Sequence, residues 1–185
     1  MSSFDIYSLM LNSLNIILHL HSFNNQILKT PMGINEAFIA ELQQESAATR
    51  KLLERVPMDK ADWTPHEKSM KLGNLAHHVS ELPGWSMVTL DQDELDFAKW
   101  EYKPEIPKTT EELVKNYDNT VAKAIECLKN ADDAKFMQDW TMRNGEQVFF
   151  TLPKAAVLRS FVFNHSYHHR AQLGVYLRLL DIPLP

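Results

Sequence analysis

Hydrophobic residues recur at helical spacing in four stretches of the chain, and these stretches are separated by segments that contain proline. The first stretch runs from Ile34 to Val56 and is closed by Pro57. The second runs from about Met70 to Leu90, the third from about Glu111 to Ala131, and the fourth from about Pro153 to Leu180. Apolar positions repeated every three or four residues indicate amphipathic helices that pack against one another. The pattern predicts an all-α fold, a four-helix bundle.

Three local signals refine this prediction. Pro83 and Gly84 lie inside the second stretch, where a proline removes a backbone hydrogen bond and kinks the helix. Thr109 and Glu112 have the spacing of a capping box at the start of the third helix. Asn144-Gly145 lies between two extended runs, which is typical of a β-hairpin. We therefore expect a short hairpin or loop before the last helix.

The first 31 residues lie outside the helical pattern. Their apolar residues are interrupted by Ser and Asn, and their first Lys or Arg is Lys29. They lack the positively charged start of a signal peptide and the long apolar run of a membrane span. We predict an N-terminal extension at residues 1–31, poorly ordered or weakly helical, and a helical domain at residues 32–185. Whether Met32 is the true start stays open.

Composition narrows the class of protein. The chain has 185 residues and a formal net charge of −5, whereas a nucleic-acid-binding domain usually presents a basic face. We expect no nucleic-acid partner and no membrane partner. The single cysteine, Cys127, excludes an intramolecular disulfide and fits a cytoplasmic location. Cys127 lies near the inner face of the third helix, where we expect a packed thiol and not a nucleophile.

Two histidines interrupt the apolar face of the fourth helix. On a four-then-three spacing, this face reads Leu158, Val162, His165, His169, Gln172, Tyr176 and Leu179. Two neutral imidazoles one turn apart can bind one transition-metal ion from a single helix. The alternative is a pair of histidines at the edge of the core, each hydrogen-bonded to its neighbours.

A third histidine is available on the second helix. Leu75, Val79 and Leu82 mark the apolar stripe of this helix, and His78 lies at its edge, whereas His77 falls on the polar side. We expect His78 to point inward and His77 to be solvated, and neither His77 nor His168 to be a metal ligand. Three protein ligands would leave a coordination position free, as in catalytic zinc sites.

The residues around these histidines resemble those of a known family. Leu72 to Trp85 reads Leu-Gly-x-Leu-x-x-His-x-x-x-Leu-Pro-x-Trp, and Asn164 to Leu173 reads Asn-His-x-x-x-His-Arg-x-Gln-Leu. Together they are similar to the motifs of the DinB/YfiT-like family, and the resemblance covers about Ile34 to Pro185. It implies a four-helix bundle and a homodimer. It also implies one divalent metal, Zn, Ni or Fe, held by His78, His165 and His169.

The resemblance leaves two functions open. One is a metal-dependent enzyme, a thiol S-transferase or a hydrolase, whose substrate is a low-molecular-weight thiol or another small molecule. The other is a non-enzymatic metal-stabilised helical bundle that acts in a stress response or in protein interaction. No general acid or base stands out, so the catalytic residues stay unknown. Arg170 and Gln172 are candidates for supporting the ligands or contacting substrate, and Arg170 is equally suited to a salt bridge on the helix surface.

Overall fold

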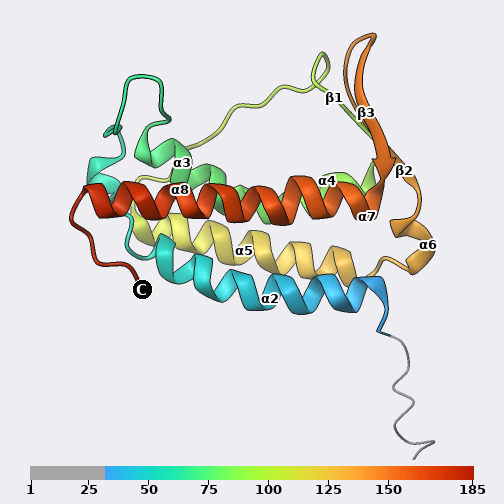
Figure 1. Ribbon diagram of the computed structural model, residues 1–185, viewed down its shortest axis with the longest axis horizontal. Coiled ribbons are helices and arrows are strands. Elements are labelled where there is room, and N and C mark those ends of the chain that lie inside the picture. Colours follow the sequence, from blue (N-terminus) through green and yellow to red (C-terminus); the bar gives the residue numbers. More distant parts are fainter. Residues whose placement is uncertain (1–31) are drawn as a thin grey trace, which may run out of the picture. The chain divides into compact units, whose positions relative to one another are not determined.

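Four helical stretches lie side by side in the part of the chain that the structure describes (Figure 1). The structure is a computed structural model and describes residues 32–185, so the prediction for residues 1–31 falls outside it. The first and third stretches are single helices, α2 (Ile34–Leu53) and α5 (Thr110–Lys129). None of the described helices is both long enough and apolar enough to cross a membrane.

The second and fourth stretches are divided into shorter segments. The second consists of α3 (Leu72–Glu81), the 3₁₀ turn η2 (Leu82–Gly84) and α4 (Trp85–Asp91). The fourth consists of α7 (Lys154–Val157), the π-helical segment η3 (Leu158–Asn164) and α8 (His165–Leu179). The predicted break at Pro83 is confirmed. The helix count therefore differs from that of a simple four-helix bundle, and the fold is mostly helical with a small sheet.

Two short helices complete the helical part: η1 (Met58–Lys60) and α6 (Asp133–Phe136). The predicted cap of α5 is present in a modified form. The Thr109 hydroxyl accepts a hydrogen bond from the Glu112 amide at 3.1 Å, as a capping residue should. The Glu112 carboxylate accepts from the amide of Lys108 at 2.8 Å, one residue earlier than a capping box requires.

The predicted hairpin is part of a three-stranded sheet. Strands β2 (Asp139–Asn144) and β3 (Gln147–Pro153) are antiparallel, and the turn between them contains Gly145 with a φ of 58°. A left-handed backbone suits glycine, which has no Cβ to clash. The third strand, β1 (Glu94–Asp96), pairs with β2 in parallel, so β2 is the central strand. Strand β1 was not predicted, and with the predicted hairpin it forms a small sheet in a mostly helical fold, where an all-α fold with a short hairpin was expected.

A buried lysine joins the sheet to the helices. The side chain of Lys154 is fully buried, and its amine donates hydrogen bonds to the carbonyl oxygens of Leu90 (3.2 Å) and Gln92 (2.7 Å). It also donates to the Asp93 carboxylate at 2.9 Å. A buried ammonium is tolerated only when its protons are all bonded, and here three acceptors are available. Lys154 thereby fixes the backbone between the end of α4 and the start of β1.

The core has three parts. The largest lies between α2, α3, α5 and α8 and contains fully buried leucines such as Leu75, Leu113 and Leu173. The second surrounds Phe38 and Phe163 at the other end of the helices. The third connects the sheet to α7 and consists of Leu95, Trp140, Met142 and Val157. Each large apolar side chain buried here stabilises the fold by about 1.5–3 kcal/mol, so packing holds the segmented helices in line.

Candidate metal centre

Three histidine side chains converge between α3 and α8. His78 comes from the middle of α3, whereas His165 and His169 stand one turn apart at the start of α8. The Nε2 atom of His165 lies 3.3 Å from that of His78 and 2.8 Å from that of His169. Donor atoms of all three residues lie within 4.8 Å of one another. The structure thus brings together the three residues that the sequence singled out.

The spacing of the ring nitrogens fits a transition-metal ion. Zinc binds imidazole nitrogen at about 2.0–2.1 Å in tetrahedral geometry, which places neighbouring ligand nitrogens about 3.3 Å apart. The separation between His78 and His165, 3.3 Å, equals this value, and that between His165 and His169, 2.8 Å, is somewhat shorter. Among the residues that the structure describes, no further His, Cys, Asp or Glu joins the group. The cluster could therefore supply three ligands to an ion, and it has the composition of an open centre.

The imidazoles are held in the neutral form that a metal ion requires. Burial, followed by the charges that His169 and His165 would carry, lowers the pKa of His78 from 6.5 to about 4. Burial also lowers the pKa of His165, again with a contribution from His169. For His169, burial lowers the pKa, and a hydrogen bond to Gln172 opposes this effect in part. At neutral pH the three rings are uncharged.

Gln172 fixes the orientation of His169. The Nδ1 atom of His169 lies 2.7 Å from the side-chain oxygen of Gln172, so Nδ1 carries the proton and donates. The lone pair of this ring is then at Nε2, which faces the other two histidines. The Gln172 amide nitrogen in turn lies 2.9 Å from Nε2 of His168 and donates to it. His168 is exposed and lies outside the ligand group.

His77 is buried and not solvated, which corrects one sequence-based expectation. Only 7% of His77 is exposed, and its Nε2 atom lies 3.2 Å from a carboxylate oxygen of Glu81. The side of α3 that looked polar is buried at Gly73 and His77, whereas Asn74 on the same side is exposed. Gly73 packs so closely on Ala61 that a Cβ there would lie 2.8 Å from the Ala61 Cβ. The expectation that His77 lies outside the ligand group agrees with the geometry of the cluster.

The inner face of the last helix differs from the predicted one beyond the histidines. Gln172 is exposed, and Leu179 is 58% exposed. Leu173 and Leu177 are fully buried instead, because they lie four and eight residues after His169 and enter the largest core cluster. The π-helical segment directly before His165 was also not predicted. Such wide turns are rare in helices and occur frequently at functional sites.

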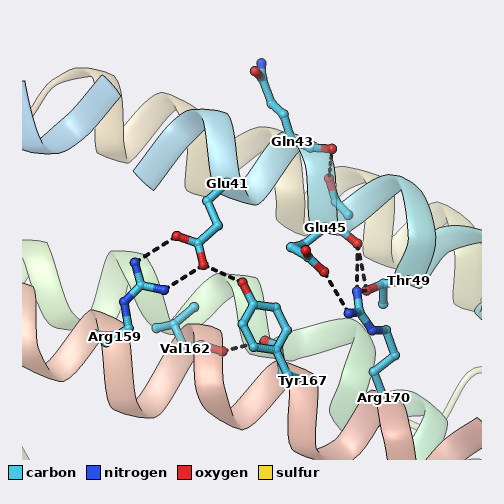
Figure 2. Close-up of polar contacts among 10 residues, drawn as sticks. Glu41, Gln43, Glu45, Thr49, Arg159, Val162, Tyr167 and Arg170 are labelled. Atoms are coloured by element: carbon cyan, nitrogen blue, oxygen red, sulfur yellow. Dashed lines mark hydrogen bonds and ion pairs between the residues drawn. The ribbon is translucent and has the colours of Figure 1, made fainter. Parts of the chain in front are cut away.

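Arg170 lies on the side of α8 that faces α2. Its guanidinium makes an ion pair with Glu45 at 2.7 Å and donates hydrogen bonds to the Glu45 carbonyl and the Thr49 hydroxyl (Figure 2). One turn earlier on α2, the carboxylate of Glu41 accepts hydrogen bonds from Arg159 and Tyr167. These contacts hold α2 against η3 and α8. The ion pair with Glu45 is the salt bridge that was the alternative prediction for Arg170.

Cys127 lies on α5 and outside the histidine cluster. Its sulfur is half-buried and 3.7 Å from a carboxylate oxygen of Asp91. Burial, together with the charge of Asp91, raises the pKa of this thiol to about 11. Since the thiolate is the nucleophilic form, Cys127 is inert at neutral pH. This agrees with the predicted packed thiol.

A cavity of about 460 Å³ opens beside His78 and His165. Its aromatic walls were not predicted, although the aromatic residues within the segment 97–102 were a possible signal. Glu81 also lines the cavity, and its carboxylate accepts a hydrogen bond from the Tyr102 hydroxyl. Burial alone would raise the pKa of Glu81, but the contacts with His77 and Tyr102 hold it below its ordinary value. Glu81 is therefore an anion at neutral pH.

Comparison with known proteins identifies the family of the chain. A model of the DinB family matches residues 25–181. The chain belongs to the DinB family. The match extends over most of the chain and includes all three histidines of the cluster. A comparison with curated proteins finds no match.

Solved DinB-like structures have the same fold. A DinB-like protein of Bacillus cereus superposes with a TM-score of 0.62 at 18% sequence identity, over 81% of this chain and 95% of that one. A DinB-like protein of Bacillus subtilis superposes with a TM-score of 0.61 at 18% identity, over 80% of this chain and 94% of that one. At such low identity the likeness concerns the fold and not the chemistry.

Proposed function

We propose that this DinB-family protein binds one divalent transition metal and is an enzyme that acts with a low-molecular-weight thiol. The ligands are His78, His165 and His169, and the ion is Zn, Ni or Fe. The observation that carries the proposal is the convergence of three uncharged ring nitrogens beside a cavity. A structural zinc site usually has four protein ligands. Three ligands, with no fourth among the described residues, favour a catalytic role over a purely stabilising one.

The protein side chains prepare the centre for this chemistry. Gln172 keeps the proton of His169 on Nδ1 and so leaves Nε2 free to coordinate. Burial keeps the histidines neutral without a metal, which avoids competition from protons at neutral pH. A bound ion would act as a Lewis acid and lower the pKa of a thiol or water substrate. The apolar side chains of the cavity would lie beside the reacting group.

Metal analysis of the purified full-length protein tests the first half of this proposal. We expect about one equivalent of Zn, Ni or Fe per chain, and loss of this metal in the His165→Ala variant. Activity with a panel of low-molecular-weight thiols then tests the second half. A protein that binds no divalent metal contradicts the proposal as a whole. Stoichiometric metal without turnover of any thiol would instead support the non-enzymatic metal-stabilised bundle.

A further inference from the structure

The cavity beside the histidines has walls that are mainly aromatic. The apolar side chains of the lining come from four segments of the chain: Trp85 and Val88 of α4, Phe97 and Trp100 of the segment after β1, Met142 of β2, and Phe161 of η3. The volume of about 460 Å³ is within the range of small-molecule sites. His78 and His165 form part of the same lining, so an occupant would touch the proposed metal ligands.

The inner wall of the cavity is preformed. Met142 belongs to the third core cluster, and Trp85, Val88 and Phe161 pack against that cluster. These side chains are held by the fully buried Trp140 and Val157 behind them. Because folding already orders these side chains, binding of a ligand does not require the free energy of ordering them.

The outer wall consists of aromatic side chains that are exposed to water. Trp100 is 37% exposed and Tyr102 is 48% exposed. The Trp100 ring stands perpendicular to Trp85 with centroids 5.5 Å apart, and it lies 5.3 Å from the Tyr102 ring. Large aromatic groups gathered at one exposed place indicate an interaction site, since leaving them in water forgoes their burial energy. The hydrogen bond from Tyr102 to Glu81 ties this wall to α3.

The charge of the lining limits the kind of ligand. Among the described residues that line the cavity, Glu81 is the only one with a formal charge at neutral pH. No Lys or Arg stands in the lining to pair with a phosphate or carboxylate. An anionic tail would therefore be buried without a partner and would face Glu81, which is unfavourable.

We infer that this cavity binds the ring-bearing, uncharged part of a small molecule whose donor atom points to the three histidines. The aromatic walls would bury a flat hydrocarbon ring, and edge-to-face contacts with Trp85 and Trp100 would add to the affinity. The inference rests on the proposed function for the donor end of the ligand. The ring-binding end rests on the cavity alone.

Calorimetry with zinc-loaded full-length protein tests both ends separately. The probes are phenylmethanethiol, which has a ring and a thiol, 2-mercaptoethanol, which has only the thiol, and toluene, which has only the ring. We expect phenylmethanethiol to bind at least about tenfold more tightly than 2-mercaptoethanol, because burying a phenyl ring contributes about 1.4 kcal/mol or more. Tryptophan emission should change on titration with either ring-bearing probe, which gives a second readout of binding beside Trp85 and Trp100.

Variants of the exposed wall locate the ring. Trp100→Ala and Phe97→Ala should each reduce the preference for phenylmethanethiol severalfold and leave the zinc content unchanged. Leu179→Ala is the matched control, because Leu179 is exposed on the helix that carries two of the histidines but does not line the cavity. This control should bind all probes like the wild type. Circular dichroism melting of each variant verifies that it is folded.

The outcomes separate the two ideas. If zinc binds and the two thiols bind equally well, or if both wall variants keep the preference, the ring-binding cavity is refuted while the metal centre stands. If zinc does not bind, yet toluene binds and is lost in Trp100→Ala, the metal-based function is refuted and the ring-binding cavity is supported. Binding of phenylmethanethiol that needs both zinc and Trp100 supports the complete inference.

Discussion

Neighbouring residues determine how deeply each of the three clustered histidines is buried and how its ring is oriented. His78 was identified from the apolar stripe of its helix, and His165 and His169 from their spacing of one turn. Their convergence follows from the contact between α3 and α8, which a sequence pattern alone does not give. His77 shows where such reasoning fails, because the face of α3 that looked polar is partly buried.

Replacement of single histidines distinguishes ligands from their neighbours. Alanine at His78, His165 or His169 should weaken metal binding by more than about 100-fold, since a lost ligand costs more than a lost outer partner. His77→Ala should keep the metal but lower the melting temperature, because it empties a buried position beside Glu81. Metal content after dialysis and thermal melting measure the two effects. Metal loss in His77→Ala but not in His78→Ala would mean that the ligand assignment is wrong.

Replacement of Gln172 should lower the affinity for the metal, although Gln172 is not itself a proposed ligand. Gln172→Leu abolishes the acceptor for the Nδ1 proton of His169, so the ring is free to rotate and to change tautomer. Loss of such a partner typically costs about 10- to 100-fold in metal affinity. Competition with a chromogenic chelator measures this change. His168→Ala is the control, because it leaves the bond between Gln172 and His169 in place, and an equal loss in both variants would contradict the proposed role.

Stability of the metal-free protein should fall as the pH falls from about 6.5 toward 4. Folding lowers the pKa of His78 to about 4, from the ordinary value of 6.5 that a solvated histidine has in the unfolded chain. In this window the unfolded state binds a proton that the folded state does not, so protons favour unfolding. Above pH 6.5 the effect is absent. Melting temperatures at pH 7 and pH 5 should differ less in His78→Asn than in the wild type or in His66→Gln, a change in an exposed loop.

At the scale of secondary-structure elements, the sequence predicted features that depend on neighbouring residues, but not those that depend on contacts between distant segments. The Pro83 break, the Thr109 cap and the turn at Gly145 depend on residues within one turn of one another, and all three are present. Strand β1 is short, and its partner β2 begins only after the whole of α5 and α6. The π-helical segment η3 contains neither proline nor glycine that would mark it. These features arise from tertiary packing.

The buried Lys154 amine links the end of α4 to the start of β1. Lys154→Met would keep the volume but leave the carbonyl oxygens of Leu90 and Gln92 without their donor. Buried acceptors left unpaired should reduce the free energy of unfolding by about 2–4 kcal/mol. Urea denaturation measures this loss. Lys103→Met, at an exposed lysine, should change stability by less than about 0.5 kcal/mol, and equal effects would contradict the role of Lys154.

At the scale of the whole molecule, we predict a homodimer. The apolar side chains Val148, Phe149 and Leu152 are exposed on β3, which is an edge strand of the sheet. An exposed apolar edge strand is a ready surface for pairing with a second chain. Sedimentation at micromolar concentration should give twice the chain mass of 21.4 kDa, and Phe149→Asp should shift the species toward the monomer. A wild-type species of 21.4 kDa would refute the prediction.

The parallel pairing of β1 with β2 has a consequence for how the molecule folds. The hairpin of β2 and β3 is local and can form within microseconds. The pairing of β1 with β2 requires the chain to cross over through α5 and α6, so the entropy of closing a long loop must be overcome first. Residues 97–102 follow directly from β1. We therefore expect the aromatic wall beside the histidines to be completed late in folding, after α5 has docked, so that a chain trapped before that step would have its helices but an incomplete cavity.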